Sequence, residues 1–289
     1  MVIGCTGNYR KTEFYTILDK VHSILSKSNI KCLVSDDFKK NELFIVSKDY
    51  LIDDFNSIMK KSDIILAIGG DGTILSTVRR MENMQKPIMG IHIGGLGFLS
   101  ECSKKNLTKS LNYILTKNYS ISNRMILKAQ INIENNKQVI YALNDFVINH
   151  GSSARVTKIM VNISKKHLNT YEGDGLIIST PTGSTAYSLS AGGPIIDPML
   201  DSITVTPICP HSLSARPIVL KANENISLKF VDLEDNMVLS IDGQVQININ
   251  NQTKVIISKA DYPAQLISLP SNGHYKTLRS KMGWAGNVR

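Results

Sequence analysis

The feature that most constrains the fold is a change of hydrophobic period near residue 120 of the 289-residue chain. Before that point, short uninterrupted apolar runs, such as 64–68, alternate with segments such as 14–25, where apolar residues recur at helical spacing. Continuous apolarity is typical of strands that are covered on both faces, as in a parallel sheet. The first part of the chain is therefore predicted to be an α/β domain.

The same two periods predict the individual elements of this first part. Strands are expected at 1–5, 30–34, 43–46, 64–68 and 88–93, and helices at 14–25, 51–60 and 107–115. This alternation of strand and helix is that of βα units, and it places the strands in one parallel sheet.

After residue 120 the apolar period becomes two. Apolar residues occupy every second position of 127–133, and Asn135-Asn136 follows as a turn, which predicts an antiparallel hairpin. Asp242-Gly243 is a second strong hairpin signal. Further short strands are expected at 146–148, 156–163, 176–179, 203–208, 226–231, 237–241, 245–249 and 255–258. The sequence thus predicts an α/β domain over 1–120 and an all-β, sandwich-like domain over 121–265.

The composition argues against several classes of protein. With 42% hydrophobic residues the chain has enough apolar material for a core, so it is not disordered. The longest apolar runs have the length of a strand, short of the roughly 20 residues that cross a bilayer. The N-terminus shows no secretory signal. We therefore expect a cytoplasmic protein that has no membrane partner.

The distribution of charge and the spacing of cysteines and histidines argue against nucleic-acid binding and against a zinc site. The formal net charge of +9 raises the possibility of nucleic-acid binding, but the basic residues are dispersed and aromatic residues make up only 6%, so no nucleic-acid partner is expected. The four cysteines form no CxxC pair, and no two of the six histidines have a chelating spacing. A zinc site is not expected.

The most specific local motif is Gly69-Gly70-Asp71-Gly72-Thr73, which follows the apolar run 64–68 directly and precedes a helical pattern. Glycines let a backbone approach a phosphate closely, and a helix N-terminus adds positive potential. A carboxylate at Asp71 would repel phosphate unless it binds a cation or accepts a proton, which suggests a catalytic or metal-linked role. The alternative is that Asp71 only caps the helix.

Two better-known phosphate-binding patterns are missing from the sequence. No GxxxxGK[ST] occurs, and the stretch 95–100 lacks the third glycine of the dinucleotide fingerprint. We interpret 94–97 as a loop that passes near the ligand or near the GGDGT turn.

A second polar segment lies in the β-rich part. Hydroxyls, glycines and one aromatic residue fill 179–194, directly after a predicted buried strand. Such a composition favours a polar ligand bound by hydroxyl and backbone N–H groups, on which Tyr187 could stack a base. The alternative is a Ser/Thr-capped helix start with a glycine-rich exit. Asn144-Asp145 and Asp174-Gly175 are turn dipeptides that gain interest from this neighbourhood.

Together these motifs resemble bacterial NAD kinases, in the same order and over nearly the whole chain. They are GGDGT at 69–73, Asn144-Asp145, Asp174-Gly175, TPTGSTAY at 180–187 and the segment 211–217. GGDGT also occurs in lipid kinases and phosphofructokinases, whereas TPTGSTAY does not. The resemblance implies a two-domain NAD kinase fold in which the tail 266–289 completes the first domain. It also implies transfer of the γ-phosphate of ATP to the 2′-hydroxyl of the adenosine ribose of NAD, which makes NADP.

The resemblance further implies roles for individual residues. Asp71 matches the proton acceptor, and Gly69, Gly70, Gly72 and Thr73 match the phosphate loop. Positions that match contacts to the dinucleotide are Asp71, Gly72, Asn144, Asp145, Arg155, Glu172, Asp174, Thr185, Ala186, Tyr187, Ser188, Leu189, Ser190 and Gln244. Some family members carry a basic residue at the position of Glu172. At the position of Asp145 they more often carry glutamate, which is one methylene longer.

Cofactor and partners follow from the same resemblance. Mg²⁺ is expected to arrive with ATP and not to be held by a protein cluster, and the chain is expected to form a homotetramer or homodimer. Three other functions stay open at this point, the third of which is a nucleic-acid-binding module that tight, steeply salt-dependent binding would support. A lipid kinase is disfavoured by TPTGSTAY and by the lack of a basic amphipathic face. A dinucleotide sensor that has lost catalysis is disfavoured by the intact GGDGT.

Overall fold

The computed structural model describes residues 1–40, 50–95, 97–133, 136–151, 156–231, 237–270 and 273–284. The chain forms two compact units. Unit 1 comprises 1–123 and 264–289, and unit 2 comprises 124–263.

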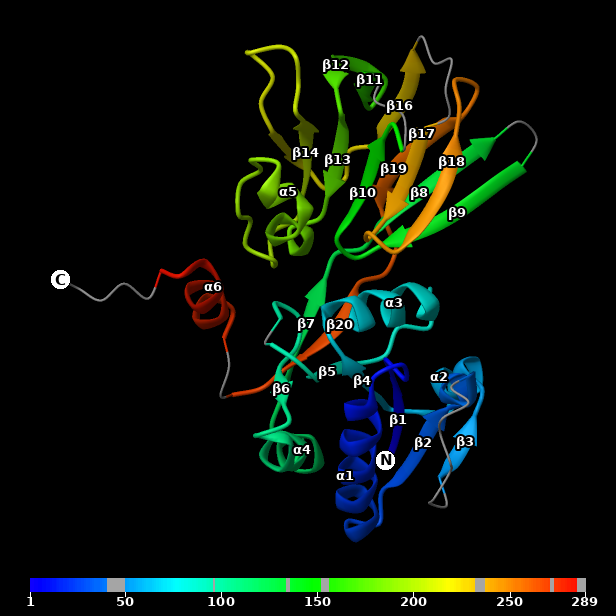
Figure 1. Ribbon diagram of the computed structural model, residues 1–289, viewed down its shortest axis with the longest axis vertical. Helices are drawn as coiled ribbons and strands as arrows, with labels where there is room; N and C mark the ends of the chain where they lie inside the picture. The colour runs from blue at the N-terminus through cyan, green and yellow to red at the C-terminus, as the bar shows by residue number, and fades with distance from the viewer. Residues whose placement is uncertain are drawn as a thin grey trace, which may run out of the picture. The chain divides into compact units, whose positions relative to one another are not determined.

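Unit 1 consists of one sheet with helices. Its strands are β1 (Val2–Gly7), β2 (Lys31–Ser35), β3 (Leu51–Asp53), β4 (Ile64–Gly69), β5 (Ile88–His92), β6 (Cys102–Ser103), β7 (Ser120–Arg124) and β20 (Ala264–Ser268). Its helices are α1 (Thr12–Lys27), the 3₁₀ helix η1 (Asp36–Lys40), α2 (Phe55–Lys61), α3 (Asp71–Met81), α4 (Leu107–Leu115) and α6 (His274–Met282). The strand order is β3-β2-β1-β4-β5-β20-β7, with β6 beside β5 (Figure 1).

The continuous apolar runs of the sequence form the interior strands of this sheet. β4 is buried along its whole length and pairs in parallel with β1 and β5. On α1 the apolar stripe faces inward, so that Phe14, Ile17 and Val21 are buried. Each such side chain contributes roughly 1.5–3 kcal/mol when it is buried. The parallel sheet confirms the α/β class predicted for the first part.

One predicted helix is wrong in its first residues. The sequence predicts a helix over 51–60, whereas Leu51–Asp53 forms β3, which pairs in parallel with β2, and the helix begins only at Phe55. Asp54 caps that helix, since its carboxylate accepts from the Ser57 N–H at 3.0 Å. A three-residue strand is too short to show a period of its own, which is why the pattern merged it with α2. The strand predicted at 43–46 lies outside the described residues.

The segment after the β-rich part supplies a strand to unit 1. β20 pairs in parallel with β5, and Leu266 lies opposite Ile88. The apolar pattern by itself does not reveal this return, because pairing between segments so far apart in sequence leaves no local signal.

Unit 2 consists of two six-stranded sheets. One sheet has the order β12-β11-β16-β19-β8-β9 and the other β15-β14-β13-β10-β17-β18 (Figure 1). The strands are β8 (Leu127–Ile133), β9 (Asn136–Ala142), β10 (Asp145–Asn149), β11 (Thr157–Ile163), β12 (Lys166–Gly173), β13 (Gly175–Ser179), β14 (Ser202–Ile208), β15 (Ile218–Lys221), β16 (Ile226–Val231), β17 (Met237–Ile241), β18 (Val245–Ile249) and β19 (Lys254–Lys259). The helical turns are η2 (Thr182–Thr185) and α5 (Tyr187–Ser190).

The two sheets share one hydrophobic core. Leu127 and Ile159 from the first sheet join Phe146 and Leu176 from the second in a single buried cluster. The strand pairs described within these sheets are antiparallel, as in the β10–β13 and β11–β12 pairs. This arrangement confirms the predicted all-β, sandwich-like class.

Both predicted hairpins are present. β8 and β9 pair from Leu127 opposite Ala142 to Ile133 opposite Asn136. Of the predicted Asn135-Asn136 turn, the first residue lies outside the described part of the chain, and Asn136 is the first residue of β9 and not a turn residue. Between β17 and β18, Asp242 and Gly243 have φ angles of 51° and 64°, which is the left-handed geometry expected for an Asp-Gly hairpin turn.

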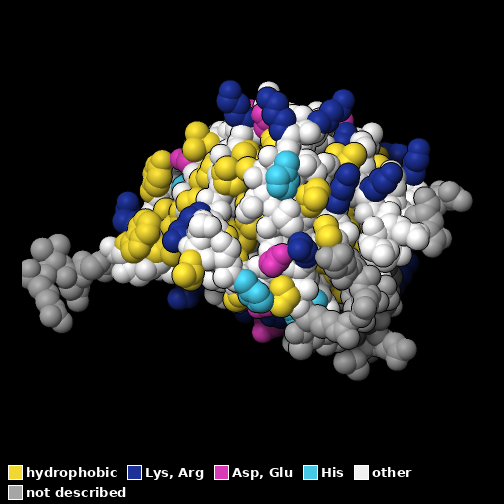
Figure 2. All heavy atoms as spheres, turned by 90° about the horizontal axis from the view of Figure 1, so that it is seen from above, with side chains coloured by type: hydrophobic (Ala, Val, Ile, Leu, Met, Phe, Trp, Pro, Cys, Tyr) yellow, Lys and Arg dark blue, Asp and Glu magenta, His cyan; other side chains and the backbone are white. Residues whose placement is uncertain are grey.

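The surface agrees with the dispersed charge of the sequence. Figure 2 shows one face of the molecule, on which Lys and Arg side chains are interspersed with polar and hydrophobic ones. Among the described residues, no helix combines the length and the apolar character needed to cross a membrane.

Candidate active site

The GGDGT motif forms the turn between β4 and α3. Gly69 ends β4, Gly70 is the N-cap of α3, and Asp71 is the first helical residue. A Cβ atom at Gly69 would lie 2.0 Å from the Thr73 hydroxyl oxygen, so this tight turn requires glycine there. Ligands of open α/β sheets bind beyond the carboxyl ends of the strands, and the helix N-terminus favours an anion. The turn therefore has the placement and the charge of a phosphate site.

The carboxylate of Asp71 is held by a segment that lies 27 to 29 residues further along the chain. Its Oδ2 accepts from the backbone N–H of Phe98 at 2.6 Å. Its Oδ1 accepts from the Leu99 N–H and from the Ser100 hydroxyl, both at 3.2 Å. A Cβ atom at Gly97 would lie 1.9 Å from the same Oδ1. The prediction that the 94–97 loop passes near the GGDGT turn is confirmed at Gly97, whereas residue 96 is not among the described residues.

These contacts test the interpretation of Asp71 as a helix cap. The N-cap of α3 is Gly70, and the hydrogen bonds of the Asp71 carboxylate go to 98–100, so the interpretation of Asp71 as only a helix cap is wrong. An ionised carboxylate has about four acceptor positions, and these three donors account for three of them. The arrangement orients Asp71 and leaves capacity to accept one further proton donor.

Gly97→Ala is expected to lower turnover at least about tenfold. The added methyl group would overlap the Asp71 carboxylate, which must rotate or shift, and misplacing a reacting group by about 1 Å can lower a rate about a hundredfold. Gly273→Ala is the matched control, because it adds the same methyl group where no atom lies within 4 Å. Steady-state assays of both variants test this, and equal rates for the two variants would contradict it.

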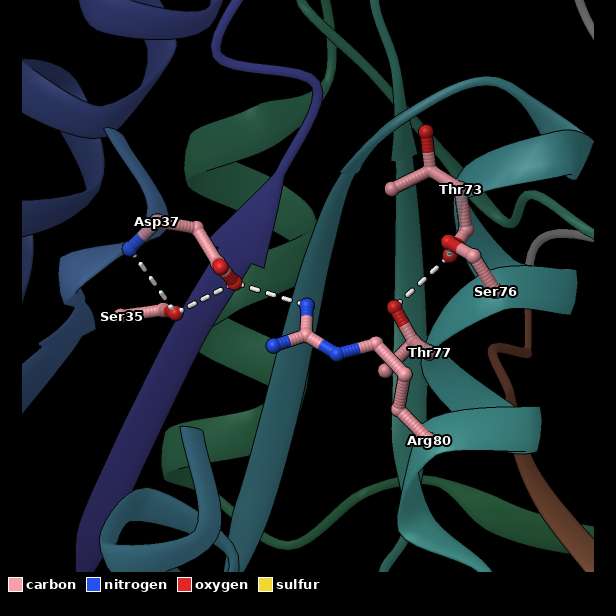
Figure 3. A network of polar contacts seen from close by, with 6 residues as sticks. All are labelled: Ser35, Asp37, Thr73, Ser76, Thr77 and Arg80. Carbon is pink, nitrogen blue, oxygen red and sulfur yellow. Dashed lines mark hydrogen bonds and ion pairs between the residues drawn. The ribbon is translucent and has the colours of Figure 1, made fainter. Parts of the chain in front are cut away.

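A polar network fixes α3 against the neighbouring part of unit 1. The Arg80 guanidinium donates to the Asp37 carboxylate at 2.7 Å, and its Cζ lies 3.7 Å from the centre of the Phe55 ring. Asp37 also accepts from the Ser35 hydroxyl at 2.8 Å. Figure 3 draws this network with residues Ser35, Asp37, Thr73, Ser76, Thr77 and Arg80. The last turn of α3 is thereby tied to η1 and α2.

The first turn of α3 is reinforced at the end of the GGDGT motif. The Thr73 carbonyl accepts from the Thr77 hydroxyl at 2.7 Å and from the Ser76 hydroxyl at 3.0 Å (Figure 3). In addition, the Thr73 N–H donates to the Gly70 carbonyl at 2.9 Å. The GGDGT turn is therefore attached to a helix whose two ends are both held by side chains.

In unit 2 the structure brings two separate motifs together. The Thr180 N–H donates to the Asn144 carbonyl at 2.8 Å, and the Thr180 hydroxyl donates to the Leu143 carbonyl at 2.6 Å. A Cβ atom at Gly183 would lie 2.1 Å from the Asn144 carbonyl oxygen. The TPTGSTAY segment therefore packs directly on the Asn144-Asp145 turn, and only glycine fits at the closest point.

Within TPTGSTAY the hydroxyls have different environments. The Thr180 hydroxyl accepts from the Gly183 N–H at 2.9 Å, while the N-cap residue of η2 is Pro181, which makes no side-chain capping bond. Ser184 bonds the Pro181 carbonyl at 2.6 Å, and Ser188 bonds the Thr206 hydroxyl at 2.9 Å, both within the interior. Tyr187, by contrast, is 46% exposed. These buried hydroxyls hold the segment together, whereas the Tyr187 ring is presented at the surface.

Asp145 is a buried carboxyl group at the start of β10. It is 3% exposed and lies opposite Ser179 of β13. Burial, and next the nearby Asp242 carboxylate, raise the pKa of Asp145 to about 7. Near neutral pH the group is therefore present in both the protonated and the ionised form, so it can either donate or accept a hydrogen bond.

The other sequence-predicted residues lie at several places in unit 2. Glu172 is on β12 and pairs with Lys158 at 2.9 Å, which lowers the pKa of Glu172. Asp174 lies between β12 and β13, and its hydrogen bond to the Cys209 thiol raises the pKa of Cys209. The remaining residues, Thr185, Ala186, Leu189, Ser190 and Gln244, belong to the η2–α5 segment or to the β17–β18 turn. Arg155 is outside the described residues.

Sequence reasoning missed two parts of this arrangement. The first is the 98–100 segment that binds Asp71, and the only signal for it was the glycine-rich loop before it. The second is Asp242, whose carboxylate accepts from the backbone N–H groups of Leu143, Asn144 and Asp145. The pattern Asp242-Gly243 indicated a turn but not this second use of the aspartate.

Comparison with known proteins identifies the family. Residues 3–119 match the family model of the ATP-NAD kinase N-terminal domain, and 143–269 match that of the ATP-NAD kinase C-terminal domain. The NAD kinase of Flavobacterium johnsoniae is 34% identical over 295 aligned positions that cover 100% of both chains. That of Clostridium botulinum is 37% identical over 288 positions that cover 98% of this chain and 96% of the relative.

Solved structures show the same fold. Yeast NADH kinase complexed with NADH superposes with a TM-score of 0.89 at 25% identity, over 100% of this chain and 89% of that chain. An NAD kinase from Archaeoglobus fulgidus in complex with ATP superposes with a TM-score of 0.75 at 20% identity, over 99% of this chain and 100% of that chain. With both units matched by family models and relatives that align along their whole length, the chain belongs to the NAD kinase family.

Proposed function

We propose that this chain transfers the γ-phosphate of ATP to the 2′-hydroxyl of the adenosine ribose of NAD and so makes NADP and ADP. Membership in the NAD kinase family supports the overall reaction. The observation that carries the chemistry is the Asp71 carboxylate, which is oriented by Phe98, Leu99 and Ser100 at the edge of the phosphate loop.

The residues of unit 1 perform the transfer. Phosphoryl transfer depends mainly on positioning and on charge stabilisation, so the backbone N–H groups at 69–73 and the N-terminus of α3 hold the γ-phosphate. Asp71 accepts the proton of the 2′-hydroxyl as its oxygen attacks the γ-phosphorus, and ADP leaves with the electrons of the broken P–O bond. The bonds from 98–100 keep the accepting oxygen in place during this step.

A divalent metal fits this site as part of the substrate. Among the residues described, no three His, Cys, Asp or Glu side chains are grouped so that they could hold a metal ion. The Asp71 carboxylate already accepts three hydrogen bonds, which leaves little capacity for direct coordination. Mg²⁺ bound to ATP supplies charge neutralisation on the phosphates.

The residues of unit 2 bind the dinucleotide. Asn144 and Asp145 lie beside the TPTGSTAY segment, and their amide and carboxyl groups suit ribose hydroxyls and the nicotinamide amide. Asp145 is one methylene shorter than the glutamate common in the family, but with a pKa of about 7 it can donate to or accept from a hydroxyl near neutral pH. The exposed ring of Tyr187 offers a stacking surface for a base. We assign Asp174, Gln244 and the 185–190 segment to the same role.

An assay that crosses phosphate donors with NAD and NADH tests the proposal. ATP with NAD is expected to yield NADP. The same assay compares the rates with other triphosphates and polyphosphate as phosphate donors, and with NADH as the acceptor. Phosphorylation of lipid in vesicles without NADP formation would favour the lipid kinase. Tight NAD binding without any turnover would favour the sensor.

A homo-oligomer in the cytoplasm, where ATP and NAD are both supplied, is also part of the proposal. The alternating strand β18 offers a sheet edge that a second copy could use. Light scattering is expected to give a mass of a dimer or tetramer of the 32.0 kDa chain. A mass of one chain over a wide concentration range, with full activity, would contradict this expectation.

A further inference from the structure

The carboxylate of Asp242 binds the backbone of three successive residues. Its Oδ1 accepts from the N–H groups of Asn144 at 2.8 Å and Asp145 at 3.3 Å, and its Oδ2 accepts from that of Leu143 at 3.3 Å. In return, the Asp242 N–H donates to the Asp145 carbonyl at 3.0 Å. Asp242 is only 8% exposed. One buried side chain at the end of β17 thus holds the backbone that leads into β10.

The Asn144 backbone is held from two sides. Its N–H is bound by the Asp242 carboxylate, and its carbonyl is bound by the Thr180 N–H at 2.8 Å. Gly183 packs against the same carbonyl so closely that no larger residue fits. Because both backbone groups of Asn144 are already hydrogen-bonded, its side-chain amide is the group that is left to bind a ligand, and the Asp242 bond helps set its direction.

The hairpin turn does not by itself require an aspartate at position 242. Its φ of 51° suits glycine or asparagine at least as well as aspartate, so the turn does not require a carboxylate. A carboxylate is the better acceptor for several N–H groups, because hydrogen bonds to a charged acceptor are about twice as strong as neutral ones. The aspartate is therefore explained by what it binds and not by the turn that it occupies.

We propose that Asp242 is a positioning residue for the dinucleotide, because its carboxylate fixes the 143–145 backbone and thereby the directions of the Asn144 and Asp145 side chains. This inference rests on the proposed binding of NAD by those two residues. The negative charge of Asp242 acts on the same site, since it also contributes to the raised pKa of Asp145.

A graded pair of variants of the full chain tests the proposal. Asp242→Gly keeps a favourable turn but removes all three acceptor bonds. Asp242→Asn keeps a side-chain oxygen that can accept from the Asn144 and Asp145 N–H groups. It loses the hydrogen bond from the Leu143 N–H, because an NH₂ group replaces the accepting oxygen there. Lys165→Gly is the matched control, because it also replaces a left-handed residue, with φ 73°, in the β11–β12 hairpin turn.

The readout is the KM for NAD and for ATP, together with the NAD dissociation constant from calorimetry and the melting temperature. We expect the NAD KM and dissociation constant to rise at least about tenfold in Asp242→Gly and about threefold in Asp242→Asn. The ATP KM should stay within about twofold of the parent in both, and Lys165→Gly should match the parent. A role confined to turn stability would lower the melting temperature without this selective loss of NAD binding.

The outcomes separate this inference from the proposed function. Unchanged NAD binding in Asp242→Gly, in a parent that makes NADP, would overturn the inference and leave the function intact. If Asp242→Gly does not fold, Asp242→Asn decides, and parent-like NAD binding in that variant overturns the inference. If the parent binds NAD without turnover, the NAD dissociation constants of the same variants, measured by calorimetry, still decide whether Asp242 positions the dinucleotide. A parent that neither binds nor phosphorylates NAD would overturn both.

Discussion

Asp71→Asn is expected to lower the turnover of NAD at least about a hundredfold while the affinity for NAD stays within about tenfold of the parent. The substitution keeps the size of the side chain but removes the proton acceptor, and general-base catalysis contributes about 10²–10⁴-fold. In free energy this is roughly 3–5 kcal/mol of the barrier. Steady-state kinetics with ATP and NAD, together with calorimetry of NAD binding, measure the two quantities separately.

The loop contacts of Asp71 call for a control of their own. Asn offers one oxygen where the carboxylate offers two, so the substitution also weakens the bonds to the Phe98 and Leu99 N–H groups. Ser100→Ala removes one loop bond and leaves the base in place, so it should lower turnover less than about fivefold. Turnover of Asp71→Asn close to that of the parent would show that Asp71 only orders the loop. The proton acceptor would then have to be Asp145 or Asp174.

Asp145→Asn is expected to make unit 2 more stable at pH 8 than the parent, by on the order of 2–4 kcal/mol. The folded-state pKa of about 7 lies above the ordinary value of 3.8, so the folded chain binds the proton more tightly than the unfolded chain does. The stabilising contribution is therefore fully present below about pH 4 and is lost as the pH rises to about 7. Asparagine is neutral at every pH and avoids this loss.

Burial of Asp145, and next the nearby Asp242 carboxylate, set the sign of that effect. Asp242 lies in the β17–β18 turn, and Ser179 is the residue opposite Asp145 on β13. Urea unfolding between pH 4 and pH 8 measures the free energy of unfolding of the parent, of Asp145→Asn and of Asp261→Asn. Asp261→Asn is the exposed control, since the side chain of Asp261 is 87% exposed and pairs with Lys128 at 3.1 Å. Parallel pH curves for the parent and Asp145→Asn would contradict a raised pKa at this residue.

The sequence predicts the parts of the fold and of the site that depend on local pattern. The apolar run before Gly69 predicts that the GGDGT turn follows a buried strand, and the structure has that strand as β4. The alternation at 127–133 likewise predicts β8 and its hairpin. These features depend on neighbouring residues, whose spacing is set by the geometry of helix and strand.

The parts that the sequence does not predict depend on contacts between distant segments. The bond from Phe98 to Asp71 spans 27 residues, and that from Asn144 to Asp242 spans 98. Each becomes visible only when the register of the strands is known, as for β10 and β17, where Phe146 lies opposite Ile241. An Asp-Gly turn is common, so the pattern itself cannot show that the aspartate side chain binds elsewhere.

The most direct test of the proposed function is the identity of the product formed from ATP and NAD. The purified full chain is incubated with Mg²⁺, ATP and NAD, and the products are followed by ³¹P NMR and by a dehydrogenase that accepts only NADP. We predict that NADP and ADP form in equal amounts and that the new phosphate is a monoester on the 2′-oxygen of the adenosine ribose. Hydrolysis of ATP without NADP, or a phosphate ester at any other position, would contradict the account.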